Sequence, residues 1–247
     1  MTARRQAGPP LGAKPAGKRR EAALPPARSA SGSAARVPSP KRTKAQASGP
    51  GPVAGMRLYT PDGTRKYVAA GERDAFLAAA ERADRQVRTL CMTLAYAGCR
   101  LSEALALTVD RVDLAAGVLI FESLKKRRLG VFRAVPVPPS LLEALDLVHG
   151  IRELQARRGK GRDRRLWPWS RMTGWRAVHA VTEAARLEGP QASPKGLRHG
   201  FGVAAVSAGI PLNLVQKWLG HAQLTTTAIY ADAVGIEEKD IARRMWG

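Results

Sequence analysis

The chain has 247 residues, enough for one sizeable hydrophobic core or two small ones, and a formal net charge of +21 from 41 Lys and Arg against 20 Asp and Glu. This excess favours a polyanionic partner, which is nucleic acid more often than an anionic membrane surface. No apolar stretch is long enough to span a bilayer, and the two cysteines and four histidines show no zinc-ligand spacing, so we expect neither a membrane segment nor a metal site.

Residues 1–56 differ in composition from the rest of the chain. They contain nine prolines, eleven Lys or Arg, one acidic residue and no aromatic residue. Such a segment buries too little apolar surface to offset the entropy of ordering, so we predict that it is disordered. It acts either as a solvated linker or as a nonspecific DNA-binding arm, and its composition favours neither reading.

Residues 57–247 are predicted to fold as one mainly helical domain with a small β-sheet, of the α+β class. Residues 70–97 place apolar side chains at helical spacing and divide into two helices near residues 83–85. Gly98 suits the C-terminus of the second helix, and Ser102 is expected to cap a short helix after it.

A β-hairpin is predicted next, with strands at 118–124 and 131–138. The second strand alternates apolar and polar residues and ends in prolines, which do not continue a ladder. The connection between the strands contains KKRR, so the tip of the hairpin is basic.

The remainder of the chain is predicted to be helical. Ser140 is expected to cap a helix of about ten residues, and residues 156–165 form a basic loop. Further helices are expected at 170–187, 198–208, 211–219 and 225–233. A C-terminal amphipathic helix at 236–246 packs either on its own domain or, in trans, on a neighbouring protomer.

Four separate stretches carry side chains suited to phosphate chemistry. They are AGCRLSEAL with Arg100, the hairpin LKKRR with Lys125, SPKGLRHGFG with Lys195 and Arg198, and LGHAQLTTTAIY with His221 and Tyr230. Guanidinium groups are permanently charged and bind two phosphate oxygens at once, while a tyrosine hydroxyl is a potential nucleophile.

Together these stretches resemble the catalytic domain of the tyrosine recombinases of the phage integrase family, over residues 57–235. AGCRLSE matches the family's G-x-R-x-S-E helix junction, and ESLKKRR supplies its hairpin lysine. KGLRHGF matches H/K-x-x-R, with lysine as an accepted variant of the commoner histidine. The sequence Leu-Gly-His is followed, nine residues after the histidine, by Tyr230. Each motif alone is weak, but four in the right order are specific.

The resemblance implies a site-specific DNA recombinase, or integrase, with the tyrosine recombinase catalytic-domain fold. Tyr230 attacks a DNA phosphodiester to give a 3′-phosphotyrosyl intermediate and a free 5′-hydroxyl. Arg100, Arg198 and His221 stabilise the negative charge of the transition state. No ATP, metal ion or other cofactor is required.

Other residues receive supporting roles from the resemblance. Lys195 helps accept the tyrosine proton or binds the phosphate, and Lys125, in preference to the adjacent Lys126, protonates the leaving 5′-oxygen. Glu103 is expected to orient a neighbouring arginine or histidine. Further contacts with DNA are expected from Lys126, Arg127, Arg128 and His199.

The implied partners are double-stranded DNA and further copies of the chain, as a tetramer on two duplexes in the bacterial cytosol. Two other functions remain open: a type IB topoisomerase-like activity with the same chemistry, and a catalytically idle or partner-dependent DNA-binding remnant. The remnant remains open because residues 1–56 are too short and polar to form the helical core-binding domain typical of the family. That domain is then absent, supplied by another chain, or replaced by the basic tail.

Overall fold

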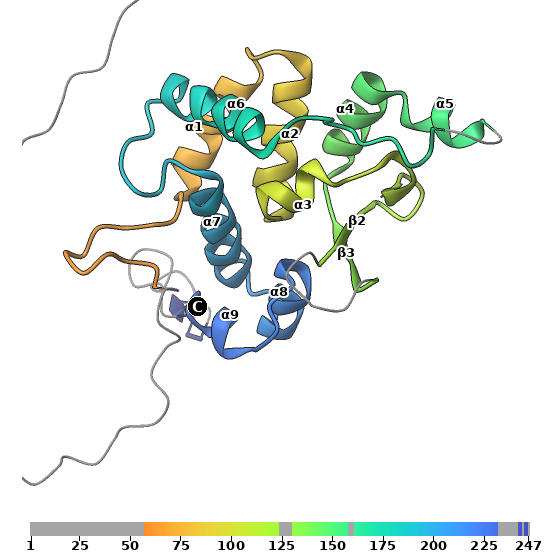
Figure 1. Cartoon of the computed structure of the whole chain (residues 1–247). Helices are drawn as coiled ribbons and strands as arrows, with labels where there is room; N and C mark the ends of the chain where they lie inside the picture. The colour runs from red at the N-terminus through yellow and green to blue at the C-terminus, as the bar shows by residue number, and fades with distance from the viewer. Residues whose placement is uncertain (1–56, 124–129, 158–160, 232–241, 244, 247) are drawn as a thin grey trace, which may run out of the picture. The chain divides into compact units, whose positions relative to one another are not determined.

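The computed structural model describes residues 57–123, 130–157, 161–231, 242–243 and 245–246. Figure 1 shows a mainly helical molecule with a small sheet on one side. The α-helices are α1 Ala70–Ala80, α2 Arg85–Ala97, α3 Leu101–Leu105, α4 Pro139–His149, α5 Ile151–Ala156, α6 Arg171–Ala184, α7 Pro194–Ser207, α8 Leu212–Leu219 and α9 Thr225–Ala228. The predicted α+β class is confirmed. No helix in the described ranges is long and apolar enough to cross a membrane.

The sheet has three antiparallel strands in the order β1-β2-β3. They are β1 Val112–Asp113, β2 Val118–Glu122 and β3 Phe132–Pro136, with a 3-10 turn, η1 Val109–Arg111, before β1. Phe121 pairs with Arg133 in the register of β2 and β3. Along β3, Arg133 and Val135 are buried while Phe132, Ala134 and Pro136 are exposed, so an arginine occupies an inward-facing position.

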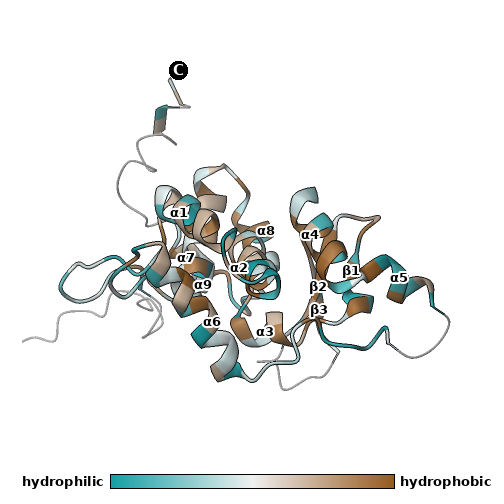
Figure 2. Cartoon of the chain, turned by 90° about the horizontal axis from the view of Figure 1, so that it is seen from above, coloured by the Kyte–Doolittle hydropathy of each residue, from teal (hydrophilic) through white to brown (hydrophobic). Residues whose placement is uncertain are grey.

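Helix α2 forms the centre of the main hydrophobic core. Its residues from Thr89 to Ala95 are all buried, and the helix contacts α1, α4, α6 and α7. The carboxylate of Asp84 accepts a hydrogen bond from the backbone N–H of Gln86 at the start of α2, and Gly98 ends the helix in a left-handed conformation. Both agree with the predicted division near residues 83–85 and the predicted C-terminus at Gly98. In Figure 2 hydrophobic residues are prominent in the packed helices and in the strands, while the connecting loops are more hydrophilic.

A second, smaller hydrophobic cluster lies around the C-terminal half of α7. It joins Leu58 and Tyr67, from the segment before α1, to Val203 of α7, Leu219 of α8 and Tyr230. Packing of this cluster therefore fixes where the helices that carry the candidate site residues meet.

Two predicted caps are wrong. Helix α3 begins at Leu101, after Arg100, because the carboxylate of Glu103 accepts the backbone N–H of Arg100; Ser102 lies inside the helix. Helix α4 begins at Pro139, before the serine expected to cap it, because proline at the first helical position has a backbone angle that suits a helix start.

Several predicted bounds also differ from the structure. Helix α7 begins four residues earlier than expected, because the hydroxyl of Ser193 accepts the backbone N–H of Gly196. Helix α6 ends at Ala184 and α9 at Ala228, earlier than expected, and both strands are shorter than expected. The sequence prediction lacked β1 and α5; Gly150, with φ 66°, separates α5 from α4. Residues 1–56, the predicted hairpin tip and most of the predicted C-terminal helix lie outside the described residues.

Candidate active site

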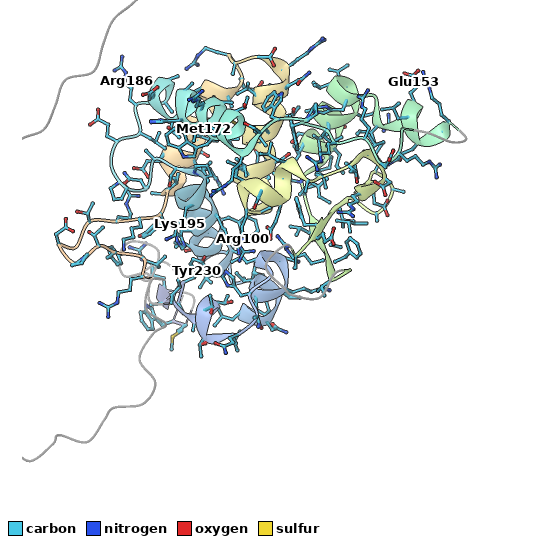
Figure 3. All side chains as sticks on the ribbon, in the orientation of Figure 1. Arg100, Glu153, Met172, Arg186, Lys195 and Tyr230 are labelled. Atoms are coloured by element: carbon cyan, nitrogen blue, oxygen red, sulfur yellow. The ribbon has the colours of Figure 1, made fainter. Side chains whose placement is uncertain are left out.

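Helix α7 brings Lys195, Arg198 and His199 to the site. Ser193 and Pro194 start the helix, so Lys195 lies in its first turn, where its side chain is exposed. One turn later Arg198 and His199 are both buried, at 5% and 1% exposure. Figure 3 shows Lys195, Arg100 and Tyr230 in the region of α7, whereas Glu153 and Arg186 lie at the periphery.

The guanidinium of Arg198 connects the ends of two helices. Its Nη1 donates to the carbonyl of Gly98 after α2 at 2.8 Å, and its Nη2 donates to the carbonyl of Leu219 at the end of α8 at 2.6 Å. Burial, and then repulsion from Arg100, lowers the pKa of Arg198 to about 10. The group is therefore still a cation at neutral pH, held in a fixed orientation by helix C-termini, which favour positive charge.

Arg100 lies at the junction between α2 and α3 and is partly open to solvent. Its side chain is 25% exposed, and its Nη1 donates to Oε1 of Glu103 at 2.7 Å. Glu103 therefore contacts a neighbouring arginine, as expected from the sequence. Burial raises the pKa of Glu103, but the ion pairs with Arg133 and Arg100 outweigh it, and the net pKa is lowered.

Arg133 of β3 also belongs to this network and was not predicted from the sequence. Its Nη2 donates to Oε2 of Glu103 at 2.6 Å, and its side chain is 4% exposed. The available signal was the alternation in the second predicted strand, which places Arg133 on the same face as Val135.

His221 follows the turn that ends α8. Gly220 has φ 66°, a left-handed conformation that favours glycine, and places His221 beside α9. The Nδ1 of His221 lies 2.9 Å from the hydroxyl of Thr227, and its Nε2 is buried without a hydrogen-bond partner among the described residues. Burial, followed by repulsion from Arg198 and Arg100, lowers the pKa of His221 to about 3, so the imidazole is neutral at pH 7.

The threonines before Tyr230 do not cap α9. Leu224 occupies the N-cap, with no side-chain hydrogen bond. The hydroxyl of Thr227 is instead directed to His221, so this residue connects α9 to the phosphate ligand expected from the sequence.

Tyr230 is packed in the second hydrophobic cluster at 1% exposure. Its hydroxyl lies 3.1 Å from Nδ1 of His199, and its ring stacks on that of His221 with centroids 6.2 Å apart and planes at 15°. A Cβ atom at Gly202 would lie 2.6 Å from the tyrosine ring, so glycine is required for this close approach. Burial raises the pKa of Tyr230 to about 12, although the charges of Arg198 and Arg100 oppose the shift.

The structure therefore brings Arg100, Arg198, His199, His221 and Tyr230 into one site. The four expected basic residues of the hairpin, Lys125, Lys126, Arg127 and Arg128, lie outside the described residues. Within the described ranges no group of three or more His, Cys, Asp or Glu could hold a metal ion. The arrangement offers fixed positive charge and a neutral imidazole next to a tyrosine, which suits an anionic substrate that is attacked by oxygen.

Comparison with known proteins agrees with this geometry. Curated relatives include the tyrosine recombinase XerD of Mycobacterium leprae (strain TN), 36% identical over 156 residues, which are 58% of this chain and 46% of the relative. They also include the tyrosine recombinase XerC of Pseudomonas putida (strain KT2440), 33% identical over 179 residues, or 70% and 55% of the two chains. The chain thus spans about half the length of the curated relatives it matches.

Solved structures share the fold. The XerA recombinase superposes with a TM-score of 0.61 at 22% identity, covering 73% of this chain and 65% of the other. The XerH site-specific recombinase bound to difH substrate gives 0.57 at 20% identity, covering 76% and 60%. The family model described as the phage integrase family matches residues 66–234, which include all the described candidate site residues. The chain therefore belongs to the phage integrase family.

Proposed function

We propose that residues 57–247 are the catalytic domain of a site-specific DNA recombinase that cleaves and rejoins DNA through Tyr230. One observation carries the proposal: the Tyr230 ring stacks on His221 and its hydroxyl contacts His199, while the charges of Arg198 and Arg100 act on the same tyrosine. A tyrosine in an apolar core gains nothing from two cations nearby, whereas a nucleophile that attacks a phosphodiester does.

In the proposed step the phenolic oxygen of Tyr230 forms a bond to phosphorus as the bond to the 5′-oxygen breaks. The product is a 3′-phosphotyrosyl link and a 5′-hydroxyl, whose proton comes from Lys125. The reverse step, with the 5′-hydroxyl of another strand, rejoins the DNA. Because the phosphotyrosyl ester conserves the energy of the broken ester bond, rejoining needs no ATP.

Negative charge grows on the nonbridging phosphate oxygens during attack. Arg100 and Arg198 offset this charge, and neutral His221 donates a hydrogen bond from Nε2, the nitrogen that has no partner among the described residues. Since a phosphate oxygen only accepts, His221 carries its proton on Nε2, and Thr227 then donates to Nδ1.

Tyr230 as described is the resting nucleophile. At 1% exposure its hydroxyl is shielded from a DNA phosphate, so the ring moves before attack. His199, rather than Lys195, contacts the hydroxyl in this conformation. Lys195 is exposed beside the site; once DNA is bound, its neutral amine accepts the proton that the Tyr230 hydroxyl loses, or its ammonium binds the phosphate. A contact between His199 and DNA likewise requires the tyrosine to move.

The proposed partners are double-stranded DNA and three further copies of the chain, which together join two duplexes in the cytosol. The net charge of +21 favours such a polyanionic partner. The C-terminal residues include Met245 and Trp246, which are 81% and 74% exposed and offer apolar surface to a neighbouring protomer.

The test is covalent capture on DNA. Nicked duplexes tiled across the segments that flank the encoding gene would be incubated with wild-type protein and with Tyr230→Phe, then run on a denaturing gel. The proposal predicts a protein–DNA adduct with wild type only. An adduct with both proteins places the nucleophile elsewhere, and binding without an adduct favours a DNA-binding remnant. Joining of two differently labelled duplexes separates recombination from topoisomerase-like relaxation.

A further inference from the structure

Arg133 is a buried cation that the proposed chemistry does not use directly. It lies on the inward face of β3, its side chain is 4% exposed, and its guanidinium lies 5.3 Å from the ring centroid of Phe121. A buried guanidinium is costly unless its donors are hydrogen bonded. All three of its nitrogens donate to protein oxygens, so the side chain has a fixed position and no donor nitrogen left without a bond.

Two of these nitrogens bind Glu103. Nη2 lies 2.6 Å from Oε2, and Nη1 lies 3.4 Å from Oε1. The same two carboxylate oxygens accept the backbone N–H of Arg100 at 2.8 Å and its Nη1 at 2.7 Å. Glu103 is thus a bridge between two arginines, and the orientation of Arg100 depends on where Arg133 holds the carboxylate.

The third nitrogen binds the end of α8. Nε of Arg133 donates to the carbonyl of Trp218 at 2.7 Å, while Arg198 binds the next carbonyl, that of Leu219, at 2.6 Å. Gly220 follows so closely that a Cβ on it would lie 3.1 Å from Nη1 of Arg133. The next residue is His221, so Arg133 supports the turn from which the imidazole projects.

We infer that Arg133 is a positioning residue for the proposed reaction, which sets Arg100 and His221 relative to each other without touching the phosphate. This inference rests on the proposed function. One guanidinium is hydrogen bonded at one end to the carboxylate that orients Arg100, and at the other to the helix end that precedes His221. Burial keeps it away from DNA.

Variants of Arg133 separate this role from a purely structural one. Arg133→Lys keeps a cation next to Glu103 but cannot donate from a planar fork to both Glu103 and Trp218. Arg133→Gln removes the charge as well. The matched control is Arg111→Gln, because Arg111, in the 3-10 turn before the sheet, forms an ion pair with Glu122 of β2 at 3.3 Å and lies outside the hydrogen bonds that join Glu103 to α8.

Each full-length protein would be checked for folding by circular dichroism and for DNA affinity by fluorescence anisotropy. The rate constant of adduct formation would then be measured at saturating protein on two nicked duplexes, one with a normal scissile phosphate and one with an uncharged methylphosphonate. A group that acts by aligning Arg100 and His221 with the phosphate charge matters less when that charge is absent.

The expected result is wild-type DNA affinity with adduct formation slowed roughly 10- to 100-fold in Arg133→Lys, and more in Arg133→Gln. The deficit shrinks on the methylphosphonate, and Arg111→Gln reacts at the wild-type rate on both duplexes. If Arg133→Lys is folded and reacts as fast as wild type, or is slowed equally on both duplexes, the inference is wrong while the proposed function stands. If wild type forms no adduct, the proposed function fails and the inference fails with it. Should Arg133→Gln not fold, Arg133→Lys alone decides.

Discussion

Nδ1 of His199 lies 3.1 Å from the hydroxyl of Tyr230, and both side chains are almost completely buried. The contact joins α7, one turn beyond Lys195, to the turn that follows α9. The hydroxyl of Tyr230, the proposed nucleophile, therefore contacts an imidazole whose pKa is lowered to about 4, mainly by burial and then by the charges of Lys195 and Arg198. At neutral pH this pair is uncharged.

The buried tyrosine predicts a loss of stability at alkaline pH. Burial raises the pKa of Tyr230 to about 12 in the folded state, against about 10 in the unfolded chain. The un-ionised Tyr230 hydroxyl makes its full contribution to the free energy of unfolding below pH 10. Because tyrosine in the unfolded chain ionises first as the pH rises, this contribution is lost between about pH 10 and 12. Urea unfolding at several alkaline pH values should therefore show a steeper fall for wild type than for Tyr230→Phe. Equal slopes for the two proteins would contradict the buried position of the hydroxyl.

The close approach of Gly202 to the Tyr230 ring predicts a large effect of one methyl group. Alanine at position 202 would place its Cβ 2.6 Å from the ring, so we expect Gly202→Ala to lower the free energy of unfolding by roughly 1–3 kcal/mol. Gly71→Ala in α1 is the control, since nothing lies within 4 Å of its Cβ position; there alanine should stabilise by about 0.5–1 kcal/mol. Combining Gly202→Ala with Tyr230→Leu measures the coupling, and additive effects would show that the two residues do not interact.

The residues of the candidate site could be predicted from the sequence alone, but the hydrogen bonds and ion pairs that fix their positions could not. Arg100, Arg198, His221 and Tyr230 follow from local motifs whose spacing is fixed, and the order of the motifs identified the fold. Arg133 was missed because its role depends on strand register and on α8 passing next to β3, neither of which is visible in a local pattern.

The start of α3 was predicted wrongly for a related reason. Ser102 has the side chain of a good N-cap, yet the backbone N–H of Arg100 is satisfied by Glu103, whose carboxylate is fixed by the buried Arg133. A tertiary ion pair thus determines where α3 begins. Propensity rules describe local competition and do not include such a partner.

The hydrogen bond between His221 and Thr227 predicts a kinetic effect of a buried hydroxyl. Thr227→Val removes the hydroxyl that lies 2.9 Å from Nδ1 of His221 and that orients the imidazole in the proposed reaction. We expect adduct formation at saturating protein to slow roughly tenfold, with little change in DNA affinity. Thr225→Val, at an exposed position of the same helix, is the matched control and should react like wild type. A Thr227→Val protein that cleaves at the wild-type rate would exclude this contact from the reaction.

Buried histidines predict that stability falls in mild acid. Burial, the largest cause for each, lowers the pKa of His149 and His199 to about 4 and that of His221 to about 3, against about 6.5 in the unfolded chain. Unfolded histidines bind protons first as the pH falls, so this contribution is complete above pH 6.5 and decreases as the pH falls to 4 and below. His149→Gln should reduce the slope of the free energy of unfolding in this range.

A matched control for the acid effect is Leu145→Val, one turn earlier on α4, which removes a buried methylene group and no titrating group. It should lower stability by a similar amount at every pH. The same slope in His149→Gln and wild type would mean that His149 does not contribute to acid unfolding.

The charge of residues 1–56 predicts that the tail changes the salt dependence of DNA binding. Residues 1–56 carry eleven Lys or Arg and one acidic residue. If they bind DNA phosphates, deleting them releases fewer counterions on binding, and the slope of log Kd against log salt concentration decreases by about 0.9 for each phosphate that is no longer neutralised. We expect the truncated protein to bind DNA more weakly at low salt and to approach the affinity of the full chain as salt is raised.

Replacing the tail by a Gly-Ser segment of equal length controls for its length, because it keeps the excluded volume and removes the charge. An unchanged slope in both variants would assign the tail a linker role, and the excess positive charge of the remaining chain would then account for the whole salt dependence.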